Sequence, residues 1–309
     1  MAAAQEKRKT STDAGESKSS PKKVKTEGAE AKQGDDTQSA DDILSYLLLD
    51  STLDSISPPE ILEPGCEKDL RYPHSDLPPF CALVSALLLS KPFSHRLGMR
   101  AIHQIFKEPY SFTTPKVILE AGGDDRWQAL KDAHTLHKDK TSGQLRDLSE
   151  LIKNEYPKDF DNSDLVEFRE KAGGDVDMLQ KNVCQIKGFA EKTTTLFFRR
   201  VQLQWSELFP YADDLALQAA KDMGLEVSSA SELRDLLKDH LGDVSEEDLR
   251  RQYIRVLEVL IGKKLDKDID ASKEEVAEVK ASDSGEGVKT DDEEKVEADE
   301  VEGKDSTES

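Results

Sequence analysis

The apolar segment that follows Pro78-Pro79 constrains the fold of this chain more than any other feature. Its large side chains recur at helical spacing, at Phe80, Leu83, Val84, Leu87 and Leu88. Ala and Leu residues also fill the remaining faces of this segment, so the pattern predicts a central helix that is buried on most sides. Phe80–Leu89 is the longest apolar run of the chain, and it is too short to span a bilayer. We therefore expect no membrane partner.

Apolar residues keep the helical spacing to about residue 264. No segment shows the alternation of apolar and polar residues that is typical of a strand. Start and stop signals support this interpretation. Ser94 is placed to cap a helix that runs to Phe106, and Gly224 is placed to close a helix over 213–223. Ser229 and Ser245 are placed to cap the last two helices. The sequence predicts an all-α fold of about ten helices.

The two ends differ in composition from the middle. Residues 1–40 hold almost no large apolar side chains, and residues 265–309 carry 6 Lys against 18 Asp and Glu. Such segments bury too little apolar surface to offset the entropy of ordering, so we expect disordered tails at 1–40 and 265–309. Residues 41–264 form the expected single domain, with about −10 of the total net charge of −21. This acidity is unusual for a protein that binds a nucleic-acid backbone.

Two basic clusters lie in the N-terminal tail. One comprises Lys7, Arg8 and Lys9, and the other comprises Lys22, Lys23 and Lys25. Their spacing resembles a bipartite nuclear import signal, which an importin reads along an extended chain. The alternative is a solvated basic patch. We expect importin binding and a nuclear location.

Cysteine and histidine patterns indicate no metal site and no cofactor. The chain has three cysteines, which are far apart and odd in number, as expected for a reducing compartment. His134 and His137 are three residues apart but have no further ligands near them in sequence.

The most informative segment for function runs from Val183 to Leu225. It predicts a helix, a tight turn containing glycine and a second helix. A hairpin of this kind directs backbone N–H groups outward, where they can hold a DNA phosphate without a basic side chain. The expected DNA-binding hairpin comprises Lys187, Gly188, Phe189, Ala190, Glu191 and Thr193.

This segment resembles the helix-hairpin-helix signature of the endonuclease III-like DNA glycosylases, the HhH-GPD superfamily. Ile186, Gly188, Phe189, Lys192 and Thr193 match the hairpin, and Ala212-Asp213 with Met223-Gly224-Leu225 match the step that follows. Leu88-Leu89-Ser90 is similar to the Leu-Leu-Ser of that family. No cluster of cysteines follows the domain, so the resemblance is to a branch without the iron–sulfur cluster.

The resemblance implies a helix-hairpin-helix glycosylase fold and base excision from damaged or abasic double-stranded DNA by a monomer. Asp213 falls on the position of the carboxylate that stabilises the developing sugar cation. Lys192 falls on the position of the amine that attacks the sugar C1′ and forms a Schiff base, which gives abasic-site lyase activity. The damaged base would have to leave the base stack.

Other interpretations of the same residues stay open. Asp213 is also a favoured helix N-cap, and Lys192 is also an ordinary solvated lysine at a helix start. Arg199 and Arg200 would line the DNA face or solvate a helix. Ala190 replaces the second glycine of the family pattern, and Lys187 replaces its proline. The alternatives to an enzyme are a catalytically silent DNA-binding protein of chromatin and an acidic nuclear scaffold.

Overall fold

The computed structural model describes residues 38–62 and 70–283, and these residues are helical with no strand. The all-α prediction is confirmed. The two predicted import clusters lie outside the described residues. The described part has fifteen α-helices instead of about ten. Short helices in the proline-rich stretch after residue 50 and one helix beyond residue 264 account for most of the difference.

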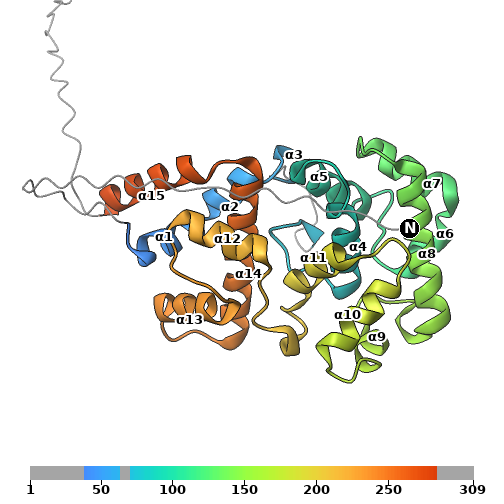
Figure 1. Ribbon diagram of the computed structural model, residues 1–309. Helices are drawn as coiled ribbons and strands as arrows, with labels where there is room; N and C mark the ends of the chain where they lie inside the picture. Colours follow the sequence, from blue (N-terminus) through green and yellow to red (C-terminus); the bar gives the residue numbers. More distant parts are fainter. Residues whose placement is uncertain (1–37, 63–69, 284–309) are drawn as a thin grey trace, which may run out of the picture. The chain divides into compact units, whose positions relative to one another are not determined.

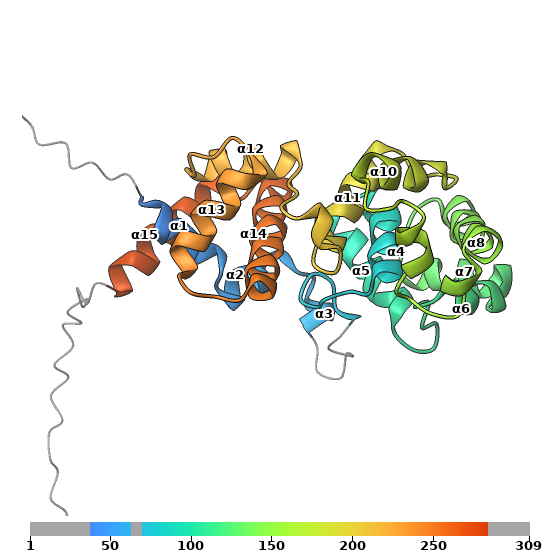
Figure 2. The ribbon, with the colours of Figure 1, turned by 90° about the horizontal axis from the view of Figure 1, so that it is seen from below.

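One hydrophobic core is built mainly from the middle of the chain (Figures 1 and 2). Its helices are α3 (Pro59–Leu62), α4 (Pro79–Leu89), α5 (His95–Phe106), α6 (Pro115–Glu120), α7 (Gly122–Asp132), α8 (Lys138–Glu155), α9 (Val166–Glu170), α10 (Val176–Gln185) and α11 (Glu191–Val201). The 3₁₀ segments η2 (Pro157–Asp159) and η3 (Ser206–Leu208) join them.

Helix α4 is the central element of this core, as its apolar pattern predicts. Every side chain from Pro79 to Leu88 is buried, and the helix packs against α5 and α11. Pro79 occupies the first turn, where its missing N–H costs no hydrogen bond. Ser94 caps α5 by accepting a hydrogen bond from the backbone N–H of Leu97 at 3.3 Å, also as predicted.

A second core combines the two ends of the described chain (Figure 1). Its helices are α1 (Ala40–Leu47), α2 (Asp50–Ile56), α12 (Asp214–Met223), α13 (Ala230–Leu241), α14 (Glu246–Asp266) and α15 (Ile269–Asp283). Helix α14 contacts α2, α12 and α13. Gly224 closes α12 in the left-handed conformation with φ of 106°, and Ser229 and Ser245 cap α13 and α14. These local predictions are confirmed.

The predicted start of the acidic tail at residue 265 is wrong. Helix α14 continues to Asp266, and α15 packs against α1 and α12. Ile269, Ser272 and Val276 of α15 are buried. Their apolar stripe is narrow and lies among acidic residues, so its burial depends on α1 and α12, which local composition does not reveal.

The described residues contain no helix with the length and apolar character that a membrane span requires.

Candidate functional site

The predicted hairpin joins α10 to α11 through a tight turn. The backbone N–H of Phe189 donates to the carbonyl of Ile186 at 2.9 Å, and Gly188 has φ of 92°. This conformation favours glycine because other residues meet a steric penalty there. Ile186 and Phe189 are both buried and anchor the turn to the core.

Ala190 fits the hairpin without backbone strain. It is the N-cap residue of α11, with φ of −132° and ψ of −179°, an extended conformation that any residue adopts. The glycine of the family pattern is therefore not required for backbone reasons at this position. No side chain caps the start of α11, and the N–H groups of Thr193 and Thr194 donate to the Ala190 carbonyl. The positive end of the helix dipole thus lies at Glu191 and Lys192.

Helix α8 lies against the hairpin. A Cβ placed on Gly188 would lie 1.7 Å from Nε2 of Gln144, so the Gln144 side chain fills the space beside the glycine. The exposed Lys187 forms an ion pair with Asp147, with 2.8 Å between Nζ and Oδ2. The hydrogen bond from Lys187 holds the pKa of Asp147 below its usual range. Asp147 also pairs with Arg146, with 2.6 Å between Oδ1 and Nη2, so Lys187 shares its carboxylate partner with a second cation.

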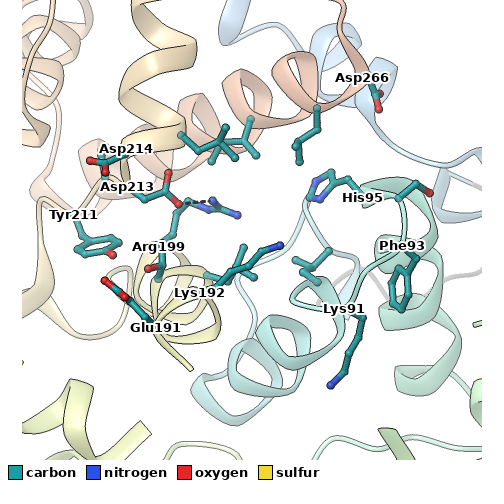
Figure 3. Close-up of a pocket in the computed structure, with 18 residues that line it drawn as sticks. Lys91, Phe93, His95, Glu191, Lys192, Arg199, Tyr211, Asp213, Asp214 and Asp266 are labelled. Atoms are coloured by element: carbon teal, nitrogen blue, oxygen red, sulfur yellow. Dashed lines mark hydrogen bonds and ion pairs between the residues drawn. The ribbon is translucent and has the colours of Figure 1, made fainter. Parts of the chain in front are cut away.

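A cavity of 730 Å³ places Lys192 and Asp213 in one site (Figure 3). Lys192 belongs to the first turn of α11, and Asp213 is the N-cap residue of α12, 21 positions later in the chain. Lys192 is exposed, and its side chain extends into the cavity in Figure 3. Apolar side chains that include the exposed Leu215 and Leu265 line part of the same cavity.

Both carboxylate oxygens of Asp213 have a partner within the protein. Oδ1 accepts a hydrogen bond from the backbone N–H of Ala216 at 2.8 Å, and Oδ2 lies 3.0 Å from Nη1 of Arg199. The side chain of Asp213 is 12% exposed, and that of Arg199 is 1% exposed. Asp213 is thus an N-cap residue and an ion-pair partner, as well as a wall of the cavity.

Arg199 and Arg200 are not on an exposed face, contrary to both sequence interpretations. They are buried around Glu258 of α14, whose Oε1 lies 3.5 Å from Nε of Arg199 and 4.0 Å from Nη1 of Arg200. The Tyr72 hydroxyl donates to the same carboxylate. Burial opposes ionisation of Glu258, but the two arginine charges hold its pKa below the usual value. Burial, with the charge of Glu258, raises the pKa of Tyr72.

Glu258 was not identified from the sequence as a site residue. The signal that could have identified it is a single carboxylate inside an apolar run, Val256-Leu257-Glu258-Val259-Leu260. A charge in a buried helix face needs a partner, but the sequence does not say which one.

Two further cavity residues, Lys91 and His95, were also not predicted. Lys91 follows the end of α4, and burial together with the charge of Lys140 lowers the pKa of Lys91 to about 8. Nε2 of His95 is buried without a hydrogen-bond partner among the described residues. Burial lowers the pKa of His95, so its ring is neutral at pH 7.

The structure thus brings Lys192 and Asp213 together, and it places the hairpin at the start of the helix that carries Lys192. Within the described residues, no group of three or more His, Cys, Asp or Glu side chains is placed to hold a metal ion. No protein-family model, no curated protein and no solved structure matches the chain.

Proposed function

We propose that this chain has the helix-hairpin-helix DNA glycosylase fold and excises damaged bases from double-stranded DNA in the nucleus. One observation carries the proposal: Lys192 and Asp213, from different helices, line one cavity next to the Gly188 hairpin. A nucleophilic amine and a carboxylate in one cavity are the two groups that this reaction needs.

In the proposed reaction, Nζ of Lys192 attacks C1′ of the deoxyribose. The bond from C1′ to the base nitrogen breaks, and its electron pair leaves with the base. Asp213 stabilises the positive charge that develops on the sugar. Nζ gives one proton to the departing base and one to the ring oxygen as the bond from C1′ to that oxygen breaks, which leaves a Schiff base between C1′ and Nζ. β-Elimination then removes a proton from C2′ to solvent and expels the 3′ phosphate, which cleaves the strand.

The cavity also suits a base that has left the stack. Its volume of 730 Å³ has both apolar walls, including Leu215 and Leu265, and polar groups, including Tyr211 and His95. Apolar surfaces stack against a base, and a few polar groups recognise its edge.

Borohydride trapping tests the proposal directly. The full chain is incubated with abasic and damaged-base duplexes in borohydride, beside the variants Lys192→Ala and Asp213→Asn. We expect a covalent adduct that is absent from Lys192→Ala and strongly reduced in Asp213→Asn. Lys221→Ala is the control, because Lys221 is an exposed lysine of α12 that does not line the cavity. An adduct of normal yield in Lys192→Ala would contradict the role of Lys192.

The silent DNA-binding protein is a second candidate, favoured by the engagement of Asp213. Its two oxygens already contact Arg199 and the Ala216 amide, which reduces the charge available to a sugar cation. This candidate predicts DNA binding without adduct or excised base, and binding that persists in Asp213→Asn. No DNA binding even at low salt would contradict both candidates and favour the acidic scaffold.

A further inference from the structure

We propose that the displaced base stacks against the ring of Tyr211, and that the cavity therefore selects bases with a planar aromatic ring over bases whose ring is saturated. The inference rests on the proposed function, because it takes the cavity as the base pocket, and it adds the class of substrate. Stacking of a base on an aromatic side chain needs two flat π faces, so it discriminates between rings by their planarity.

The backbone of Tyr211 is fixed by Gln202, the C-cap residue of α11. The backbone N–H of Tyr211 donates to Oε1 of Gln202 at 2.8 Å, and Nε2 of Gln202 donates to the carbonyl of Tyr211 at 3.0 Å. Gln202 is 0% exposed, and its Nε2 also donates to the carbonyl of Arg199 at 2.8 Å. A buried side chain thus holds both polar groups of the Tyr211 backbone, so the residue needs little further ordering when a ligand binds.

The ring of Tyr211 is positioned by Phe198 of α11. The two rings meet edge to face, with centroids 5.6 Å apart and an angle of 86° between their planes. Phe198 is buried, whereas Tyr211 is half-buried and lines the cavity. Tyr211 therefore has a contact that fixes its ring and a remaining surface that a ligand in the cavity can reach.

Tyr211 also lies where the base is expected. Ala212 alone separates Tyr211 from Asp213 in the chain, and all three residues line the cavity (Figure 3). Asp213 is the group proposed to face the sugar, and the base is joined to C1′ of that sugar by a single bond. A ring beside Asp213 is therefore within reach of the base. Phe93, another aromatic residue of the cavity, lies beyond His95 and away from Asp213 in Figure 3.

Uracil and 5,6-dihydrouracil separate stacking from hydrogen bonding. The two bases present the same hydrogen-bonding edge, but saturation of the bond between C5 and C6 removes the aromatic π system and puckers the ring. A cavity that recognises the edge alone treats the two bases alike, whereas a cavity that stacks the base on tyrosine prefers uracil.

The binding arm measures the Kd of the full chain for duplexes that carry one uracil or one dihydrouracil, in the Lys192→Ala protein so that turnover is suppressed. The decisive quantity is the ratio of the two affinities, and its change between variants, because differences between the duplexes themselves cancel. We expect Tyr211→Leu to reduce the preference for uracil about tenfold, which is the effect of one lost stacking contact. Tyr211→Phe should leave the preference unchanged, because it keeps the ring.

Tyr110→Leu is the matched control. Tyr110 is also half-buried and also packs on an aromatic ring, that of Phe112 at 5.8 Å between centroids, but it does not line the cavity. Its replacement should leave the preference for uracil unchanged.

The release arm measures excision of the two bases by the chain that retains Lys192. A preference for uracil that persists in Tyr211→Leu would overturn the stacking role, and excision by the same chain would leave the proposed function standing. A preference that is lost in Tyr211→Leu, without release of either base, would support stacking on Tyr211 and contradict excision. No binding of either duplex at low salt would overturn both.

Discussion

Arg199 and Asp213 form an ion pair of 3.0 Å that joins the cavity wall to a buried charge network. Arg199 also faces Glu258 at 3.5 Å, so one guanidinium serves two carboxylates from different helices. The position of Asp213 therefore depends on α11 and α14 as well as on its own helix. A change at Glu258, which does not itself line the cavity, should reach the proposed active site through Arg199.

Glu258→Gln is expected to destabilise the protein by about 3 kcal/mol, because it removes a buried carboxylate that serves Arg199, Arg200 and Tyr72. Urea unfolding measures the change. Glu274→Gln is the control, since Glu274 is exposed on α15. A loss below about 1 kcal/mol for Glu258→Gln would show that the network does not hold the helices together.

Gly188→Ala is expected to destabilise the hairpin by more than about 1 kcal/mol for two reasons. Its φ of 92° disfavours a Cβ, and that Cβ would collide with Gln144. Urea unfolding measures the loss of stability. The double variant Gly188→Ala with Gln144→Ala should recover the stability that the collision costs, but not the stability that the positive φ costs an alanine.

Gly143→Ala is the matched control for this experiment. Gly143 lies inside α8, and a Cβ there would meet no atom within 4 Å. The substitution should stabilise the protein by about 0.5–1 kcal/mol, because alanine favours the helix interior. Equal effects at positions 143 and 188 would rule out a special conformation of the hairpin glycine.

Stability is expected to rise with pH between about 5 and 7, in part because of His95. Burial lowers the pKa of His95, so below the unfolded value of about 6.5 the unfolded chain binds more protons than the folded one. His74 is shifted in the same direction, also through burial. Unfolding free energies measured across this range should show a smaller slope in His95→Leu. If the slope of unfolding free energy against pH is the same in His95→Leu, the pKa of His95 does not differ between the folded and the unfolded protein.

Val276→Asp is expected to detach α15, because it places an unpaired charge at a side chain that is 0% exposed. Amide hydrogen exchange should then increase in α15 and in α1, against which α15 packs. Ala277→Asp is the control at the adjacent exposed position and should leave the protection of α1 unchanged. Retained protection in Val276→Asp would contradict the docking of α15.

The sequence by itself determined the all-helical class and many helix ends of this protein. Ser94, Gly224 and Ser229 act on backbone groups within a few residues, so their effects are readable from local sequence. The same holds for the hairpin, since a turn with φ of 92° favours glycine at position 188. The pairing of Lys192 with Asp213 came from the family resemblance, and both residues line one cavity.

Tertiary structure alone decided which polar side chains meet. Glu258 reaches Arg199 from 59 positions away, and Gln144 reaches Lys91 from 53 positions away. The helix α15 is ordered because α1, from the other end of the described chain, offers a surface for its narrow apolar stripe. Ion pairing and burial depend on distances in space, and a helical pattern specifies a face without specifying what packs against it.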